Sequence, residues 1–351
     1  MGSGSSCEYS QEIYDSCALN IYERALRETC IIPDVGLDRS LLKYSGLNSN
    51  AELQTYSDGL VNQIPEYVEK LGSSLSSCTL FPNAVGLGAL MISMIIDISM
   101  KSHVATSDDS YSKFLQAFGE EKASGVRDTV SEYVKRHRMY LTDNRHLQGE
   151  LERLEIQLSN HLTILRNSLL LDGQMRSRGL KIWVNGASFH VQMLIHQARL
   201  NHTTGISSKG YVHVIQAALT TYLQDLDQLL EKHRKDFAGH TAVGHEMNCG
   251  GDNSCLSGLM SVCSLQNPNI MCLFQLQPAG KDLCISTSNY QVYGSGGTLD
   301  HNTKQLSDSF INHIFSKHPP LAGLKSHFSN IKNNLNYYIN QHDEFTLPSA
   351  R

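Results

Sequence analysis

A heptad pattern of apolar and aromatic residues over residues 130–165 constrains the fold more than any other feature of the sequence. Its positions step by alternating three and four residues, as one face of a helix does in coiled-coil-like packing. Polar residues occupy much of its first half, where we expect looser packing, and Asn144 is a candidate for setting the register. The pattern predicts one long helix whose seam packs within the chain or between two copies of it. The seam positions are Val130, Tyr133, His137, Tyr140, Asn144, Leu147, Leu151, Leu154, Leu158, His161 and Leu165.

Helical periodicity also recurs on both sides of this seam. Before it, the stripes cover residues 10–28, 50–71 and 108–119; after it, they cover 180–198 and 214–230, and Gly239 ends the second of these. Short polar connections between such helices are typical of antiparallel neighbours. We therefore predict an elongated antiparallel helical bundle over residues 10–238, following a flexible stretch over residues 1–9.

The composition changes after residue 239, where Gly, Ser, Asn and Cys become frequent up to about residue 300. Apolar residues alternate strictly over 270–276 and again over 283–287, with a Pro- and Gly-containing turn between them, which predicts a β-hairpin or a short meander. Helical patterns return over 303–316 and 321–342. The predicted fold class is mainly α, with a small Cys- and Gly-rich α+β region over residues 239–351.

Charge and cysteine content narrow the function and the compartment. The 29 Lys and Arg residues against 34 Asp and Glu residues leave a net charge of −5, which argues against nucleic-acid binding. Nine cysteines accompany a first twenty residues that carry neither a basic nor an apolar signal region. We therefore expect a reducing, intracellular location in which most thiols are free.

The first residues, Met1-Gly2-Ser3-Gly4-Ser5-Ser6, fit the pattern for N-myristoylation of Gly2. One myristoyl chain binds a membrane only marginally, so stable attachment needs a second signal. Cys7 can supply it by palmitoylation, whereas the nearby acidic residues exclude a basic cluster. We expect a protein that is cytoplasmic and peripheral on the inner leaflet. A small disordered start of the chain is the alternative interpretation.

An uncharged apolar stretch over residues 84–96 is the second candidate membrane feature. It is shorter than the roughly 20 apolar residues that cross a bilayer, so it predicts a buried core helix. The alternative is a helix that leaves the core to enter a membrane. Its candidate insertion residues are Leu87, Leu90, Met91, Met94 and Ile95.

Residues suited to catalysis or metal binding show no strong pattern. Five cysteines between Cys249 and Cys284 have gaps too wide for a local zinc knuckle. His190, His196, His202 and His213 surround one loop, but His190 and His196 have leucines rather than a second ligand one turn on, so we interpret these histidines as helix-surface residues. No nucleophile-elbow or zinc-protease motif occurs. We predict no enzyme, no cofactor and no metal site, and keep a thiol- or metal-dependent enzyme on residues 240–284 as a remote alternative.

These patterns together predict an N-acylated helical adaptor or regulatory protein that acts through contacts with a protein partner, which the sequence does not identify. Homo-oligomerisation through the seam over residues 130–165 is a further possibility. The alternative function is a membrane-perturbing helical bundle that releases residues 84–96 into a bilayer, an analogy at the level of architecture.

Overall fold

A computed structural model describes the secondary structure of residues 10–26, 32–38, 80–81, 124–140, 144–203, 208–239, 241–242, 258–263, 271–279, 282–290, 301–340 and 345–346. Helices dominate these residues, which confirms the prediction of a mainly α fold. The chain divides into two compact units. Unit 1 comprises Met1–Val35, Gly173–Leu180 and Gln228–Gly323, and unit 2 comprises Gly36–Asp172, Lys181–Asp227 and Leu324–Arg351.

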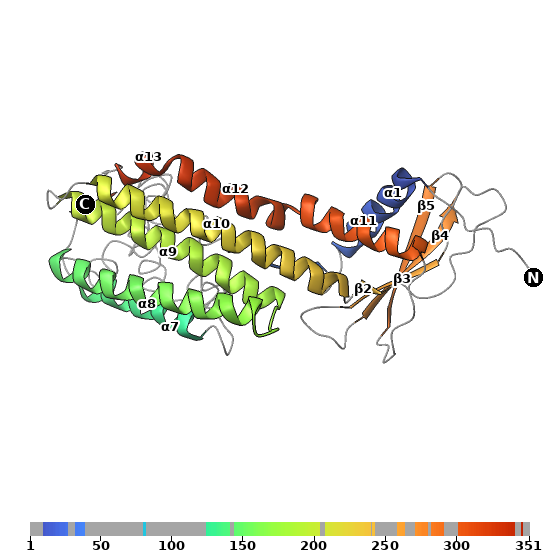
Figure 1. The fold of residues 1–351 in the computed structure, drawn as a ribbon, viewed down its shortest axis with the longest axis horizontal. Helices are drawn as coiled ribbons and strands as arrows, with labels where there is room; N and C mark the ends of the chain where they lie inside the picture. The colour runs from blue at the N-terminus through green and yellow to red at the C-terminus, as the bar shows by residue number, and fades with distance from the viewer. Residues whose placement is uncertain are drawn as a thin grey trace, which may run out of the picture. The chain divides into compact units, whose positions relative to one another are not determined.

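Unit 2 begins its described part with two antiparallel helices, α7 (Ser124–Met139) and α8 (Asn144–Leu170). Near the end of α7, Arg136 Nε lies 3.6 Å from Glu150 Oε2 on the first half of α8. At the other end of the pair, the start of α7 contacts the imidazole of His161. The predicted seam over 130–165 is therefore divided between two helices that fold back on each other (Figure 1).

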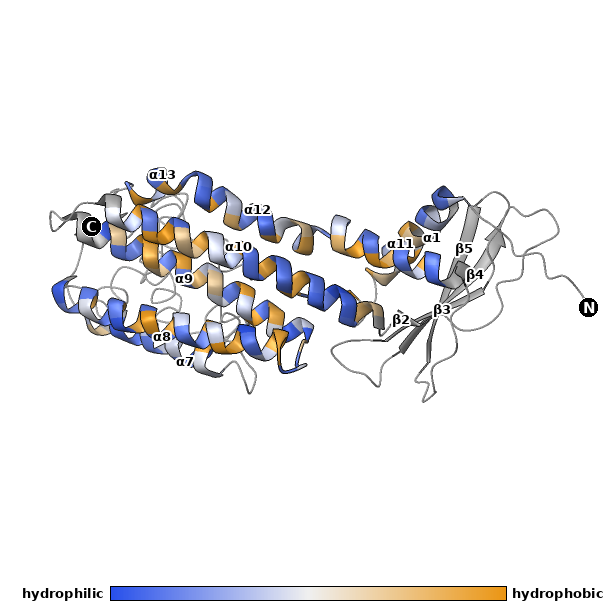
Figure 2. Cartoon of the chain, viewed as in Figure 1, coloured by the Kyte–Doolittle hydropathy of each residue, from blue (hydrophilic) through white to orange (hydrophobic). Residues whose placement is uncertain are grey.

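The local sequence accounts for the interruption, because Thr142, Asp143 and Asn144 are residue types that favour the N-terminus of a helix. On α8 the seam continues as a row of leucines, each at most 4 % exposed. At its C-terminal half the buried position is Leu162 rather than the predicted His161, which is partly exposed. The buried row is Leu147, Leu151, Leu154, Leu158, Leu162, Leu165 and Leu169. Figure 2 shows apolar and polar residues alternating along this helix, as expected for a helix with one buried face.

Helix α9 (Ser177–Thr203) is buried on every side from residue 182 to residue 199. It passes close to its neighbours at Gly186, where an added Cβ would lie 2.7 Å from Leu162 Cδ2 and 3.1 Å from Val126 Cγ1. A glycine at this position thus permits α9 to approach both α7 and α8.

Helix α10 (Ser208–Gly239) follows α9, and helix α12 (Pro319–Asn333) runs antiparallel to α10. Within unit 2 two contacts fix this orientation: the Lys332 ammonium donates to Thr220 Oγ1 at 2.8 Å, and Lys325 forms an ion pair with Asp227. The short helix α13 (Leu335–Ile339) ends the helical part of unit 2. Strands β1 (Leu80–Phe81) and β6 (Phe345–Thr346) pair antiparallel in the same unit.

Unit 1 contains helix α1 (Gln11–Ala25), which packs against helix α11 (His301–Lys317). The Tyr22 hydroxyl lies 3.0 Å from His318 Nδ1, and the Gln11 amide donates to Ser309 Oγ at 2.8 Å. The unit also contains an antiparallel sheet of order β2-β3-β4-β5, visible in Figure 1. Its strands are β2 (Thr241–Ala242), β3 (Gly258–Cys263), β4 (Met271–Ala279) and β5 (Asp282–Tyr290).

Among the helices for which the structure has a description, none combines the length and the apolar content needed to cross a bilayer.

Candidate functional site

Helix α9 carries an unusual number of polar side chains in the interior of unit 2. Asn185, Ser188, Gln192 and Arg199 are fully buried, and His190 and His196 are at most 3 % exposed. Buried polar groups cost free energy unless they find hydrogen-bond partners. On α9 most of these partners come from other elements of unit 2, so the polar groups fix the positions of the neighbouring elements.

The partners of α9 are distributed over much of unit 2. Asn185 accepts from the Asp38 amide at 2.7 Å and donates to the Gly36 carbonyl at 3.2 Å. The Arg199 guanidinium donates to the Tyr338 carbonyl at 2.6 Å. Within the described part of the chain, the Gln192 side-chain amide is buried and forms no hydrogen bond.

One of these contacts extends into a chain of three titratable side chains from three helices. His190 Nε2 on α9 lies 2.7 Å from Glu155 Oε1 on α8, and His190 Nδ1 lies 2.9 Å from the Tyr222 hydroxyl on α10. An ionised carboxylate only accepts, so Nε2 carries the hydrogen that binds Glu155. In the neutral imidazole, Nδ1 then accepts the hydroxyl hydrogen of Tyr222.

Burial, with smaller contributions from Glu155 and Asp225, raises the pKa of the Tyr222 phenol. The phenol therefore remains protonated at physiological pH and acts as a hydrogen-bond donor. A tyrosine in this state is a poor general base and a poor nucleophile. We interpret the Glu155–His190–Tyr222 chain as a polar connection that holds α8, α9 and α10 in register.

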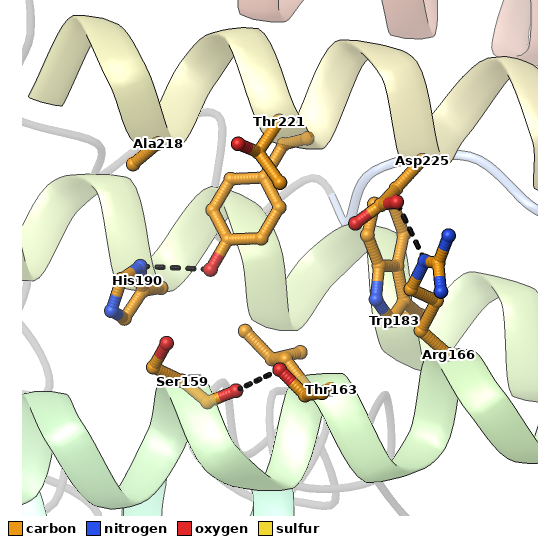
Figure 3. Close-up of a pocket in the computed structure, with 10 residues that line it drawn as sticks. Ser159, Thr163, Arg166, Trp183, His190, Ala218, Thr221 and Asp225 are labelled. Atoms are coloured by element: carbon orange, nitrogen blue, oxygen red, sulfur yellow. Dashed lines mark hydrogen bonds and ion pairs between the residues drawn. The ribbon is translucent and has the colours of Figure 1, made fainter.

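Beside this chain lies a cavity of about 220 Å³ between α8 and α10 (Figure 3). An ion pair between Arg166 on α8 and Asp225 on α10 lies at its edge, with Arg166 Nε 2.6 Å from Asp225 Oδ1. The rings of Trp183 and Tyr222 meet edge to face with centroids 5.7 Å apart. The residues that line the cavity are Ser159, Leu162, Thr163, Arg166, Trp183, His190, Ala218, Thr221, Tyr222 and Asp225.

Two more histidines in unit 2 bind hydroxyl groups, the buried His196 and the partly buried His327. His196 Nδ1 lies 2.9 Å from the Tyr133 hydroxyl, and His327 Nε2 lies 3.0 Å from Ser188 Oγ. Burial lowers the pKa of His327 from 6.5 to about 4, so this imidazole is neutral at physiological pH. Burial also raises the pKa of the Tyr133 phenol well above 10.

The interpretation of His190 and His196 as helix-surface residues is wrong. It relied on the absence of metal-ligand spacing and did not consider that a buried imidazole can bind a tyrosine hydroxyl on another helix. One sequence signal could have found these residues: from Ile182 to Gln197, α9 contains no charged residue. A helix without a charged face is typically buried on all sides.

The residues predicted for lipidation, Gly2 and Cys7, lie outside the described residues, as do all five candidates for membrane insertion, Leu87, Leu90, Met91, Met94 and Ile95. Of the cysteines considered for a metal site, Cys249 and Cys255 also lie outside. The backbones of Cys263, Cys272 and Cys284 lie in β3, β4 and β5 respectively.

Among the residues that the structure describes, no group of three or more His, Cys, Asp or Glu side chains is placed to hold a metal ion. The geometry of the candidate site thus consists of a carboxylate–imidazole–phenol chain, whose imidazole and phenol are buried, and an adjacent small cavity. Comparisons of this chain with protein-family models, with curated proteins and with solved structures find no match.

Proposed function

We propose that this protein is a helical adaptor or regulatory protein, held on the cytoplasmic face of a membrane by acylation of Gly2 and Cys7, that acts by binding another protein. The observation that carries the protein-binding part is a row of exposed apolar side chains on α8. Ile156 is 62 % exposed, Ile164 is 54 % exposed and Leu171, directly after the helix, is 75 % exposed.

The spacing of these residues supports a contact surface. They are separated by eight and seven residues, which places all three within an arc of about 80° around a helix. The opposite side of α8 is occupied by its buried leucines. Single exposed apolar residues are ordinary on protein surfaces, whereas an aligned set is typical of interaction sites.

Low charge along this row supports the same proposal. Between Ile156 and Leu171 the only charged residue is Arg166, which is paired with Asp225. The central parts of protein–protein interfaces are likewise depleted of charged residues.

The proposal includes a finer description of the architecture: an elongated antiparallel bundle whose coiled-coil-like packing is carried by α8, and a C-terminal α+β region with a hairpin. The antiparallel contacts of α7 with α8 and the antiparallel register of β4 and β5 support it. Homo-oligomerisation remains one form that the protein–protein contact can take.

The membrane part of the proposal is tested by metabolic labelling with a myristate analogue, comparing the wild type with Gly2→Ala. We expect the substitution to abolish labelling and to shift the protein from the membrane fraction to the soluble fraction. Equal labelling and equal membrane fractions would reject the acyl anchor.

The protein-contact part is tested separately with a photo-crosslinking amino acid at position 164 in cells. We expect a discrete crosslinked adduct that disappears when Ile156 is changed to Glu. Ala217→Glu, which places the same charge on an exposed position of α10, is the matched control and should leave the adduct intact. A pattern of adducts that Ile156→Glu does not alter would contradict a contact through α8.

The second candidate function, perturbation of a membrane by residues 84–96, is favoured only by the apolar run in the sequence. Leakage of dye-filled liposomes distinguishes it from the adaptor. A membrane-perturbing protein would release dye, and charge substitutions at Leu90 and Met94 would stop the release, whereas an adaptor would release none.

A further inference from the structure

The cavity between α8 and α10 has the size of a site for one small organic molecule. A cavity of about 150 Å³ holds a benzene ring, and this one measures about 220 Å³. It therefore has room for one ring and a short polar arm. All the residues that line it belong to unit 2, and Figure 3 shows them converging from three helices.

Part of the lining is apolar and suits the body of such a molecule. Leu162 and Trp183 are both about 1 % exposed, and Ala218 adds a small methyl group from α10. Tyr222, on α10, also lines this space. The faces of aromatic rings carry negative potential and attract cations within about 6 Å.

The polar part of the lining consists mainly of hydrogen-bond acceptors. The Thr163 hydroxyl donates its hydrogen to the Ser159 carbonyl at 3.0 Å, and the Thr221 hydroxyl donates to the Ala217 carbonyl at 3.1 Å. Each hydroxyl has one hydrogen, so what these threonines can offer a ligand is a lone pair. The Tyr222 hydroxyl is likewise engaged with His190.

Asp225 adds a charged acceptor. One carboxylate oxygen binds Arg166, and Figure 3 shows the other directed away from Arg166. Arg166 is the only cationic side chain of the lining, and it donates both to Asp225 and, at 3.0 Å, to Asn167. Glu155, which is hydrogen-bonded to His190, is a second carboxylate near the cavity. Two carboxylates and one guanidinium therefore surround it.

We propose that this cavity binds a small organic amine in its ammonium form, with an apolar body of about one ring. The ammonium donates to Asp225 and to the threonine oxygens, and the apolar body packs against Leu162, Ala218 and the aromatic rings. A carboxylate or phosphate ligand would meet acceptors rather than donors and is disfavoured. This inference does not rest on the proposed adaptor function, and either can fail without the other.

The test is a titration of the full-length protein with benzylammonium chloride, benzyl alcohol and sodium benzoate, which share a ring and differ in charge. Trp183 is the single tryptophan of the chain and lines the cavity, so its fluorescence reports binding, with calorimetry as an independent measurement. A hydrogen bond between charged partners is stronger than a neutral one. We expect benzylammonium to bind about tenfold or more tightly than the alcohol, and benzoate not to bind.

Two pairs of variants locate the site. Ala218→Leu fills the cavity and should abolish binding, whereas Ala217→Leu, at the exposed neighbouring position, should leave binding unchanged. Asp225→Asn should reduce the preference for benzylammonium over the alcohol to about twofold or less. Thr221→Val leaves the ion pair between Arg166 and Asp225 intact and should weaken benzylammonium binding several-fold. This variant tests the polar contacts of the site if Asp225→Asn does not fold.

Equal affinity for the amine and the alcohol would overturn the proposed chemistry of the site. Absence of saturable benzylammonium binding up to millimolar concentration, or binding that Ala218→Leu leaves intact, would overturn the site itself.

Discussion

The partly buried imidazole of His327 should make the stability of unit 2 depend on pH. The folded protein holds this side chain neutral, with Nε2 at 3.0 Å from the Ser188 hydroxyl, and burial lowers its pKa from 6.5 to about 4. In the unfolded chain the same imidazole regains a pKa near 6.5. Between these two values the unfolded state binds more protons than the folded state, so stability falls as the pH falls.

The magnitude follows from the difference between the two pKa values. Each pH unit within the window from about 6.5 to 4 changes the free energy of unfolding by about 1.4 kcal/mol for one histidine. Because the slope is only half its full value at pH 6.5, acidification from pH 6.5 to 4.5 should remove about 2 kcal/mol through His327 alone. A domain has a total stability of about 5–15 kcal/mol, so the effect is large enough to measure.

The assay is urea unfolding followed by the fluorescence of Trp183, which is buried in unit 2, the unit that also contains His327. His327→Gln replaces the imidazole by a side-chain amide, which can bind the Ser188 hydroxyl but cannot be protonated in this pH range. We expect the variant to lose about 2 kcal/mol less than the wild type between pH 6.5 and 4.5. His213→Gln, at an exposed position of α10, should behave as the wild type does.

The reasoning would be refuted if His327→Gln and the wild type lost the same free energy over this pH interval. That result would mean that protonation of His327 does not destabilise the folded protein, and that the burial of this imidazole does not lower its pKa.

Three further predictions concern packing. Leu154→Ala should cost about 2–5 kcal/mol in urea unfolding because it opens a cavity in the core, whereas Ile156→Ala, two positions along and exposed, should change stability by less than about 0.5 kcal/mol. Gly186→Ala should destabilise unit 2 by about 1–3 kcal/mol in urea unfolding, because the added methyl group overpacks the contact with Leu162. Gly149→Ala, at a position with open space around it, should instead stabilise α8 by about 0.5–1 kcal/mol. Changes of the same sign in the two variants would contradict this reasoning. Tyr22→Phe removes a buried hydrogen bond and should speed hydrogen exchange in α1 by about fivefold, corresponding to about 1 kcal/mol; unchanged exchange would count against it.

Helical periodicity in the sequence located several elements well. The stripes over 180–198 and 214–230 lie within α9 and α10, and Gly239 ends α10 as expected. The stripe over 10–28 corresponds to α1. Local periodicity predicts such helices because one buried face imposes a spacing that the sequence records directly.

The same reasoning failed where the fold brings distant residues together. The seam over 130–165 is continuous in the sequence and divided between α7 and α8 in the structure. A heptad pattern is compatible with one long helix or with two antiparallel helices that pack through their apolar faces. Both arrangements bury the same positions.

The candidate site illustrates the limit most clearly. Glu155, His190 and Tyr222 are separated by 35 and 32 residues, and no local motif connects them. The sequence by itself determined a mainly α fold, because amphipathic spacing is a local property of each helix. Only the tertiary structure decided which polar side chains are buried and which meet, because burial and hydrogen bonding depend on how helices from distant parts of the chain pack around α9.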